Sequence, residues 1–194
     1  MAAAKPASFK IILGSKSVAR RKILADMGYQ FTVMTADIDE KGIRRENPAE
    51  LVSVLAKAKT NNEPTLLITS DIVVVHKGII REKPSSEEEA WEFLKGYSGG
   101  HVSTVGSVVI TNLKTGVRIE GLDTAEVYFH DIPDEIIAKL IDERVVFNVA
   151  GGLLLEHPLQ LPFVEAVVGA SDSVMGLPMA LTEELIHRSV ASQS

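Results

Sequence analysis

A short polar turn near the start of the chain carries the residues best suited to hold an anion. Residues 13–21 read Leu-Gly-Ser-Lys-Ser-Val-Ala-Arg-Arg, between a short apolar run and a predicted helix. A helix N-terminus offers unpaired backbone N–H groups and the positive end of the helix dipole. Ser15 and Ser17 add hydroxyls, and Arg20 adds a guanidinium that can pair with phosphate. Taken alone, the segment is more simply explained as an N-cap followed by a solvated basic helix face.

Carboxylates stand at two places where they could hold a divalent cation. Residues 37–40 form the acidic run Asp-Ile-Asp-Glu, and Mg²⁺ is commonly bound through one or two carboxylates and water. Taken alone, the run is more simply explained as an acidic surface turn. Asp71 differs, because it interrupts the apolar run 66–75, where an unpaired buried charge is costly. We therefore expect Asp71 to sit at a strand end, to meet a cation or to take part in chemistry.

Other polar residues are less informative by themselves. Lys59 ends a helix that we predict from Asn47, and Lys83 precedes another helix, so each alone is an ordinary surface lysine. The 5 histidines show no spacing typical of a zinc site, and neither a Walker A nor a G-x-S-x-G motif occurs. The absence of Cys excludes disulfides and thiolate chemistry.

The apolar periodicity predicts strands that alternate with helices. Strands are expected at 9–13, 30–35, 66–75, 102–111, 117–129 and 163–168, and helices from Ser15 or Ser17, Asn47, Ser85 or Ser86, Pro133 and Thr182. Trp91 and Leu94, three positions apart, are assigned to the apolar side of the third helix. This pattern indicates an α/β fold with a mixed sheet. We predict one domain over residues 1–194, with a flexible stretch at 1–8.

Length and charge limit the classes of function. With 194 residues the chain is long enough for one well-packed core. Its net charge of −6 argues against a nucleic-acid polymer as partner, because such proteins are usually basic. The apolar runs are too short to span a membrane, and no leader segment is evident. We therefore expect a cytoplasmic protein.

The order of these segments resembles the Maf family of nucleoside triphosphate pyrophosphatases, relatives in fold of the inosine-triphosphate pyrophosphatases. The match covers most of the chain, from Ile11 to Pro178. It is carried by seven short motifs in family order: Ser15-Lys16-Ser17-Val18-Ala19-Arg20, Asp39-Glu40, Leu55-Ala56-Lys57-Ala58-Lys59, Ser70-Asp71-Ile72-Val73-Val74, Glu82-Lys83-Pro84, Ser98-Gly99-Gly100-His101 and Val174-Met175-Gly176-Leu177-Pro178.

The resemblance implies a mixed twisted sheet with flanking helices, in two lobes around a cleft. It also implies hydrolysis of a nucleoside triphosphate to a monophosphate and pyrophosphate, with Mg²⁺ or Mn²⁺ as cofactor and a homodimer as a plausible assembly. The role implied is removal of non-standard or excess nucleotides, with dTTP and UTP favoured over a 7-methylated guanine nucleotide.

Site roles follow from the resemblance, residue by residue. Catalysis is assigned to Asp71, Glu40 and Lys83, and Glu40 and Asp71 are also expected to hold the metal. Substrate binding is assigned to Ser15, Ser17, Arg20, Lys59 and Glu156.

Several positions depart from the family pattern. Ala19 stands where the first arginine of a pair is usual, and Ile72 replaces the polar residue that usually follows the aspartate. In the segment 149–156, Leu153 replaces an aromatic residue and Glu156 an amide. The stretch between Lys59 and Leu66 is shorter than usual. These changes motivate an alternative, a catalytically impaired nucleotide-binding protein of the same fold that acts as a regulator.

Overall fold

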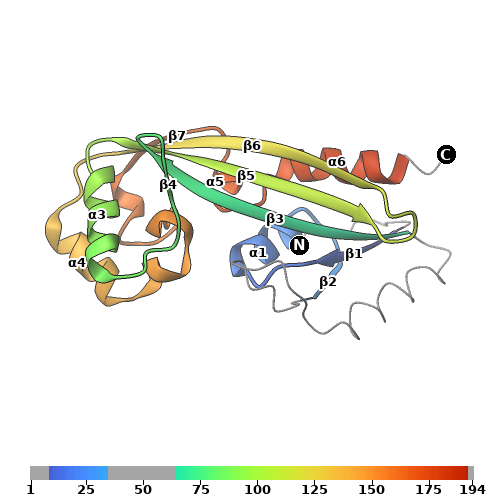
Figure 1. Ribbon diagram of the computed structural model, residues 1–194, viewed down its shortest axis with the longest axis horizontal. Coiled ribbons are helices and arrows are strands. Elements are labelled where there is room, and N and C mark those ends of the chain that lie inside the picture. The colour runs from blue at the N-terminus through green and yellow to red at the C-terminus, as the bar shows by residue number, and fades with distance from the viewer. Residues whose placement is uncertain (1–8, 35–63, 192–194) are drawn as a thin grey trace. The chain divides into compact units, whose positions relative to one another are not determined.

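The computed structural model describes residues 9–34 and 64–191. Seven strands of this described part form one mixed sheet, in the order β2-β1-β3-β5-β6-β7, with β4 paired to β3. Strand β1 (Lys10–Leu13) is parallel to both β2 (Phe31–Val33) and β3 (Thr65–His76). Strand β4 (Ile79–Arg81) runs antiparallel to β3, and β7 (Val164–Val168) antiparallel to β6. The α/β class with a mixed sheet and flanking helices is therefore confirmed (Figure 1).

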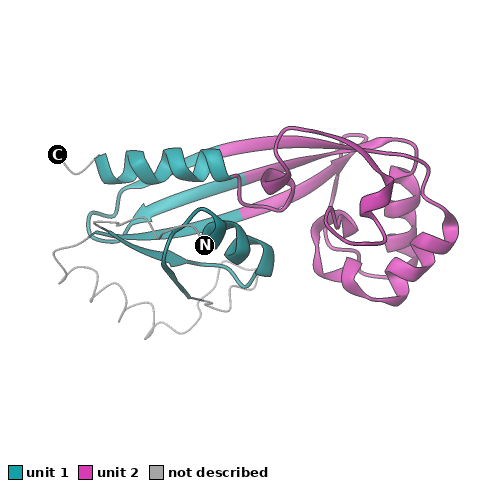
Figure 2. Cartoon of the chain, turned by 180° about the vertical axis from the view of Figure 1, so that it is seen from behind, with its two compact units in different colours: residues 1–70, 107–121, 179–194 teal, residues 71–106, 122–178 magenta. Residues whose placement is uncertain are grey.

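The chain divides into two compact units (Figure 2). Unit 1 comprises residues 1–70, 107–121 and 179–194, and unit 2 comprises residues 71–106 and 122–178. Three long strands contribute to both units: β3, β5 (His101–Asn112) and β6 (Arg118–Phe129). The single domain over 1–194 and the cleft between two lobes stay predictions.

Unit 1 is built on β1 and the helix that follows it. Helix α1 (Val18–Asp26) begins at the cap Ser17 and buries Ile23 and Leu24, as the sequence predicts. Helix α6 (Met179–Ala191) buries Leu185 and Ile186. Gly121 of β6 leaves room for the Leu181 side chain, because a Cβ there would lie 2.6 Å from Leu181 Cδ1.

The start of α6 corrects one prediction. The helix begins at Met179, directly after Pro178, and not at Thr182. Thr182 is fully buried within the helix, so its hydroxyl caps no helix end. The sequence signal misled because Thr is a common cap, whereas here Thr182 is a buried residue inside the helix.

Unit 2 surrounds a larger apolar core. Helix α3 (Glu87–Tyr97) buries Ala90, Phe93, Leu94 and Tyr97, and α4 (Asp134–Asp142) buries Ile137, Leu140 and Ile141. These side chains pack with one face of β5 and β6, including Val102, Val127 and Phe129. The alternation of buried and half-buried residues along β5 is that of a strand with one face in the core. Trp91 is 37% exposed, so our assignment of it to the buried side of α3 is wrong; Phe93 takes that place.

Short helical turns fill the segment between α4 and β7. They are η1 (Val145–Asn148), η2 (Ala150–Gly152) and η3 (Leu161–Phe163), and a short helix α5 (Ser171–Val174) follows β7. No helix in the described part of the chain is long and apolar enough to cross a membrane.

Gly151 provides a test of how tightly unit 2 is packed. Its φ is +61°, and a Cβ there would lie 2.7 Å from Val74 Cβ and 2.9 Å from the Tyr97 hydroxyl. Gly151→Ala should therefore lower the free energy of unfolding by roughly 2–4 kcal/mol, from backbone strain plus overpacking. Urea unfolding followed by circular dichroism measures this loss.

Gly116→Ala is the matched control. Gly116 also has a positive φ, +78°, but a Cβ there would meet nothing within 4 Å. This substitution should lower the free energy of unfolding by roughly 1–2 kcal/mol, from backbone strain alone. Equal losses at the two positions would contradict a packing constraint at Gly151.

Candidate functional site

Asp71 lies in the middle of β3, at the first residue of unit 2. Its side chain is exposed, and its Oδ1 accepts a hydrogen bond of 2.8 Å from the backbone N–H of Ile72. The expected position at a strand end is therefore wrong. Because the side chain is exposed, its charge needs no buried counter-ion. The bond to Ile72 fixes the orientation of the carboxylate.

The polar turn before α1 is held mainly by its own side chains. Ser17 accepts a hydrogen bond from the backbone N–H of Arg20 at 3.3 Å, which makes it the N-cap. Ser15 accepts a bond from the backbone N–H of Ser17 at 3.2 Å. The first turn of α1 contains no acidic residue, so the helix dipole there remains available to an anion.

The Arg20 side chain connects this turn to β3. Its Nη1 donates to the backbone carbonyl of Ser70 at 2.6 Å and to the Ser15 hydroxyl at 3.5 Å. The backbone N–H of Gly14 donates to the carbonyl of Ile68 at 2.9 Å. Two contacts therefore hold the turn against the part of β3 that directly precedes Asp71. A guanidinium has five N–H donors in a planar fork, the group that commonly recognises phosphate.

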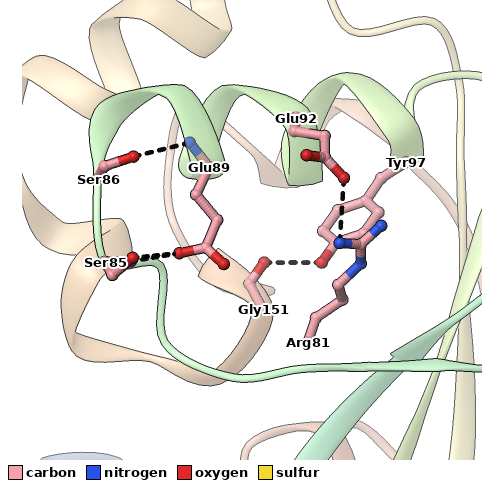
Figure 3. Close-up of polar contacts among 7 residues, drawn as sticks. All are labelled: Arg81, Ser85, Ser86, Glu89, Glu92, Tyr97 and Gly151. Carbon is pink, nitrogen blue, oxygen red and sulfur yellow. Dashed lines mark hydrogen bonds and ion pairs between the residues drawn. The ribbon is translucent and has the colours of Figure 1, made fainter.

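Lys83 lies on the exposed loop between β4 and α3, in unit 2. The loop is fixed at its far end by Glu89, whose carboxylate accepts 2.7 Å bonds from both the backbone N–H and the hydroxyl of Ser85. Ser86 caps the helix by accepting the N–H of Glu89 at 3.2 Å. These contacts form a reciprocal cap at the start of α3 (Figure 3).

Arg81 fixes the near end of the same loop. Its Nη1 pairs with Glu92 of α3 at 3.1 Å (Figure 3). Its guanidinium lies over the Phe93 ring, 4.7 Å from the ring centroid. Lys83 therefore projects from a short segment that is anchored to α3 on both sides.

A second contact joins the Lys83 loop to the glycine-rich segment around η2. The backbone N–H of Gly151 donates to the carbonyl of Glu82 at 2.9 Å, and the buried Tyr97 hydroxyl donates to the carbonyl of Gly151 at 2.9 Å (Figure 3). Burial raises the pKa of Tyr97 well above its ordinary value. The phenol therefore stays protonated and able to donate.

Glu156 lies a few residues further along, with an exposed side chain. Its neighbour Leu155 is buried, and His157 pairs with Glu143 at 3.1 Å between Nε2 and Oε2. The Leu154 N–H donates to the buried Gln160 side chain at 2.7 Å. The segment is thus held on both sides of the exposed Glu156.

The predicted site residues fall in two groups within the described structure. Unit 1 contains Ser15, Ser17 and Arg20, and unit 2 contains Asp71, Lys83 and Glu156. Glu40 and Lys59, with the acidic run 37–40 and the helix predicted from Asn47, lie outside the described residues.

The donor chemistry of Asp71 fits a divalent cation. Proteins usually bind Mg²⁺ through one or two carboxylates, and waters and substrate phosphates supply the remaining ligands. Asp71 is such an exposed carboxylate, with one oxygen bound to the Ile72 N–H. Among the described residues, no group of three or more histidine or acidic side chains could hold a metal by itself.

Comparison with known proteins decides the family. The sequence pattern of the family described as "Maf-like protein" matches residues 10–189. The chain belongs to this family. It is 39% identical to a 7-methyl-GTP pyrophosphatase of Dictyostelium discoideum, over 92% of this chain and 96% of that protein.

Bacterial relatives are similar over comparable lengths. The chain is 29% identical to a dTTP/UTP pyrophosphatase of Alkaliphilus metalliredigens, over 92% of this chain and 95% of the relative. It is 31% identical to a dTTP/UTP pyrophosphatase of Neisseria meningitidis, over 91% and 92% of the two chains. The Maf resemblance proposed from the motifs is confirmed.

The structure of this Maf-like protein explains motif residues whose role sequence reasoning missed. Gly151 lies in the segment 149–156, where only Leu153 and Glu156 were singled out, yet it binds the Lys83 loop through Glu82. Tyr97 and Arg81, which hold that arrangement, were not singled out at all. The pair Gly151-Gly152 was the available signal, because adjacent glycines indicate backbone that must pass close to other groups.

The cap of α3 predicts a dependence of stability on pH. The hydrogen bonds from Ser85 hold the pKa of Glu89 below its ordinary value of 4.5. Because the folded-state pKa is depressed, Glu89 stabilises the fold above about 4.5, and this stabilisation is lost as the pH falls through the lower folded value. Glu89→Gln should lower the free energy of unfolding at pH 7 by less than about 1 kcal/mol, because solvent screens the group.

Urea unfolding at several pH values measures this effect. The difference between the wild type and Glu89→Gln should shrink as the pH falls below about 4.5. Glu135→Gln, an exposed change in the first turn of α4, is the matched control and should show the smaller difference at pH 7. A difference for Glu89→Gln that persisted unchanged in acid would contradict the role of its charge.

Proposed function

We propose that this Maf-like protein hydrolyses nucleoside triphosphates to a nucleoside monophosphate and pyrophosphate. The observation that carries the proposal is family membership over residues 10–189, together with relatives that are named pyrophosphatases. Retention of Asp71, Lys83, Ser15, Ser17 and Arg20 in family motifs supports it further.

Each residue is proposed to act according to its charge and place. Asp71 is the general base that accepts a proton from the attacking water. Lys83, on its anchored loop, offsets the charge that develops on the pyrophosphate leaving group. The N-terminus of α1, Ser15, Ser17 and Arg20 hold the triphosphate. Glu40 and Lys59 are assigned by resemblance alone to the metal and the substrate.

Asp71, with Glu40, is proposed to hold Mg²⁺ or Mn²⁺. A bound divalent cation would neutralise phosphate charge and make the attacking water more acidic. The exposed position of Asp71, with its carboxylate oriented by the Ile72 N–H, supports this assignment. A cytoplasmic location, a homodimeric assembly and a role in clearing the nucleotide pool are part of the same proposal.

Pyrophosphate release from a panel of nucleoside triphosphates, with Mg²⁺ or Mn²⁺, tests the activity. Asp71→Asn should reduce kcat roughly 100- to 10,000-fold, the usual contribution of a general base. Asp142→Asn, at an exposed position on α4, is the matched control and should keep the wild-type rate.

The alternative has a distinct signature. Tight nucleotide binding without turnover by the wild type would favour the regulatory, catalytically impaired protein. Full turnover by Asp71→Asn would instead contradict the assignment of the base.

For the base, we propose a preference for a 7-methylated guanine nucleotide. The 39% identity to the Dictyostelium enzyme exceeds the 29% and 31% to two dTTP/UTP enzymes. Methylation at N7 gives guanine a positive charge, which an exposed carboxylate such as Glu156 would attract. This proposal replaces our preference for pyrimidines, which rested on resemblance alone.

Kinetics with competing substrates measure the preference. Glu156→Gln should lower kcat/KM for 7-methyl-GTP relative to UTP by about tenfold, the effect of losing one favourable charge contact. Glu165→Gln, an exposed change on β7, should leave the ratio unchanged. An unchanged ratio in Glu156→Gln would assign base selection to other residues.

A further inference from the structure

A hollow of about 410 Å³ lies in unit 2 and contains none of the site residues discussed above. Its walls are the end of β3 with the turn into β4, the end of α3 with the glycines that follow, and the start of β5. The polar residues that line it are His76, Lys77, Ser98, His101 and Ser103. This hollow belongs to one compact unit, so its walls are fixed by the packing of that unit.

The side chains around the hollow favour an anion. Lys77 and His101 are exposed and can both carry positive charge, and no carboxylate is among the lining residues. The Ser98 hydroxyl already accepts a bond of 2.7 Å from the Ile132 N–H, so its own proton is free to be donated. Ser103 supplies a second hydroxyl at the wall.

His76 reports on the electrostatics of the hollow. It is 5% exposed, and its ring meets Tyr97 edge-on with centroids 5.2 Å apart. The pKa of His76 is lowered, and burial is the largest cause. The positive charges of Lys77, Arg81 and His101 lower this pKa further, whereas a backbone hydrogen bond at Gly96 raises it. Three basic groups therefore disfavour protonation of the His76 imidazole. A bound anion would offset their positive charge.

The geometry of the walls leaves room for both the imidazole and a ligand. A Cβ at Gly96 would lie 2.9 Å from His76 Cε1, so the ring occupies space that only glycine leaves open. Lys77 is in the left-handed region at φ 51°, followed by Gly78 at φ 78°. This tight turn places the lysine at the rim of the hollow.

We propose that this hollow binds a small oxyanion of the phosphate type, held by Lys77, His101 and the hydroxyls of Ser98 and Ser103. Asp131 places a negative charge close to Gly99, a lining residue: its Oδ1 lies 2.7 Å from the position that a Cβ of Gly99 would take. Removal of Lys77 and removal of the Asp131 charge should therefore change the affinity in opposite directions. The proposal is independent of the proposed hydrolysis.

Titration with inorganic phosphate and with pyrophosphate, without divalent metal, tests the site. The Cε1–H signals of His76 and His101 in NMR spectra are the readout, with chloride used to hold the ionic strength constant. Both signals should move with saturation, and that of His76 should move in the direction of protonation. The two anions distinguish a site for a single phosphate from one for a longer phosphate chain.

Variants locate the binding site. Lys77→Asn removes the charge yet tolerates a left-handed backbone, and it should weaken binding about threefold to tenfold, the effect of one lost charge contact. Asp131→Asn should tighten binding of the anion. Lys139→Gln, an exposed change on α4, should leave the affinity unchanged.

Two results would overturn the proposal. One is that the two histidine signals stay fixed during both titrations. The other is that Lys83→Gln abolishes the shifts while Lys77→Asn leaves them unchanged, which would assign the anion to the candidate active site.

Discussion

The hydrogen bond from Tyr97 to the carbonyl of Gly151 is the contact on which the arrangement of unit 2 depends. It joins the last turn of α3 to the glycine-rich segment, and the other side of the same glycine binds Glu82 beside Lys83. A phenol buried in an apolar core must donate to a partner, because an unsatisfied hydroxyl there is costly. The need of the buried Tyr97 hydroxyl for an acceptor thus helps to fix the backbone next to Lys83, a proposed catalytic residue.

The two groups of site residues are positioned by different physical means. In unit 1 the positions depend on a helix cap and on one guanidinium that reaches β3. In unit 2 they depend on a reciprocal cap, an arginine stacked on an aromatic ring, and backbone bonds to glycine. Both arrangements use rigid secondary structure to support polar groups that remain accessible.

Local signals predicted most of the described elements. Serine caps located the starts of α1 and α3, and a run of strand-forming residues at 102–111 located β5, because these patterns depend on neighbours in the chain. Asp71 and Arg20 were singled out by residue type and position, and Lys83 through its motif, all without knowledge of their contacts. The errors at Trp91 and Thr182 have another cause: which face of a helix is buried, and whether a threonine caps or packs, depends on residues distant in the sequence. The role of Gly151 was hidden for the same reason, since Val74 and Tyr97 create the constraint.

The bond between Arg20 and Ser70 also has a thermodynamic consequence. Opening of the polar turn would release the carbonyl that immediately precedes Asp71, so local unfolding of α1 and loosening of this part of β3 share a free-energy cost. Any ligand that stabilises the turn therefore also stabilises the strand, and the reverse holds by reciprocity. The Arg20 side chain, together with the Gly14 N–H, thus couples the order of the surface turn to the order of the sheet strand.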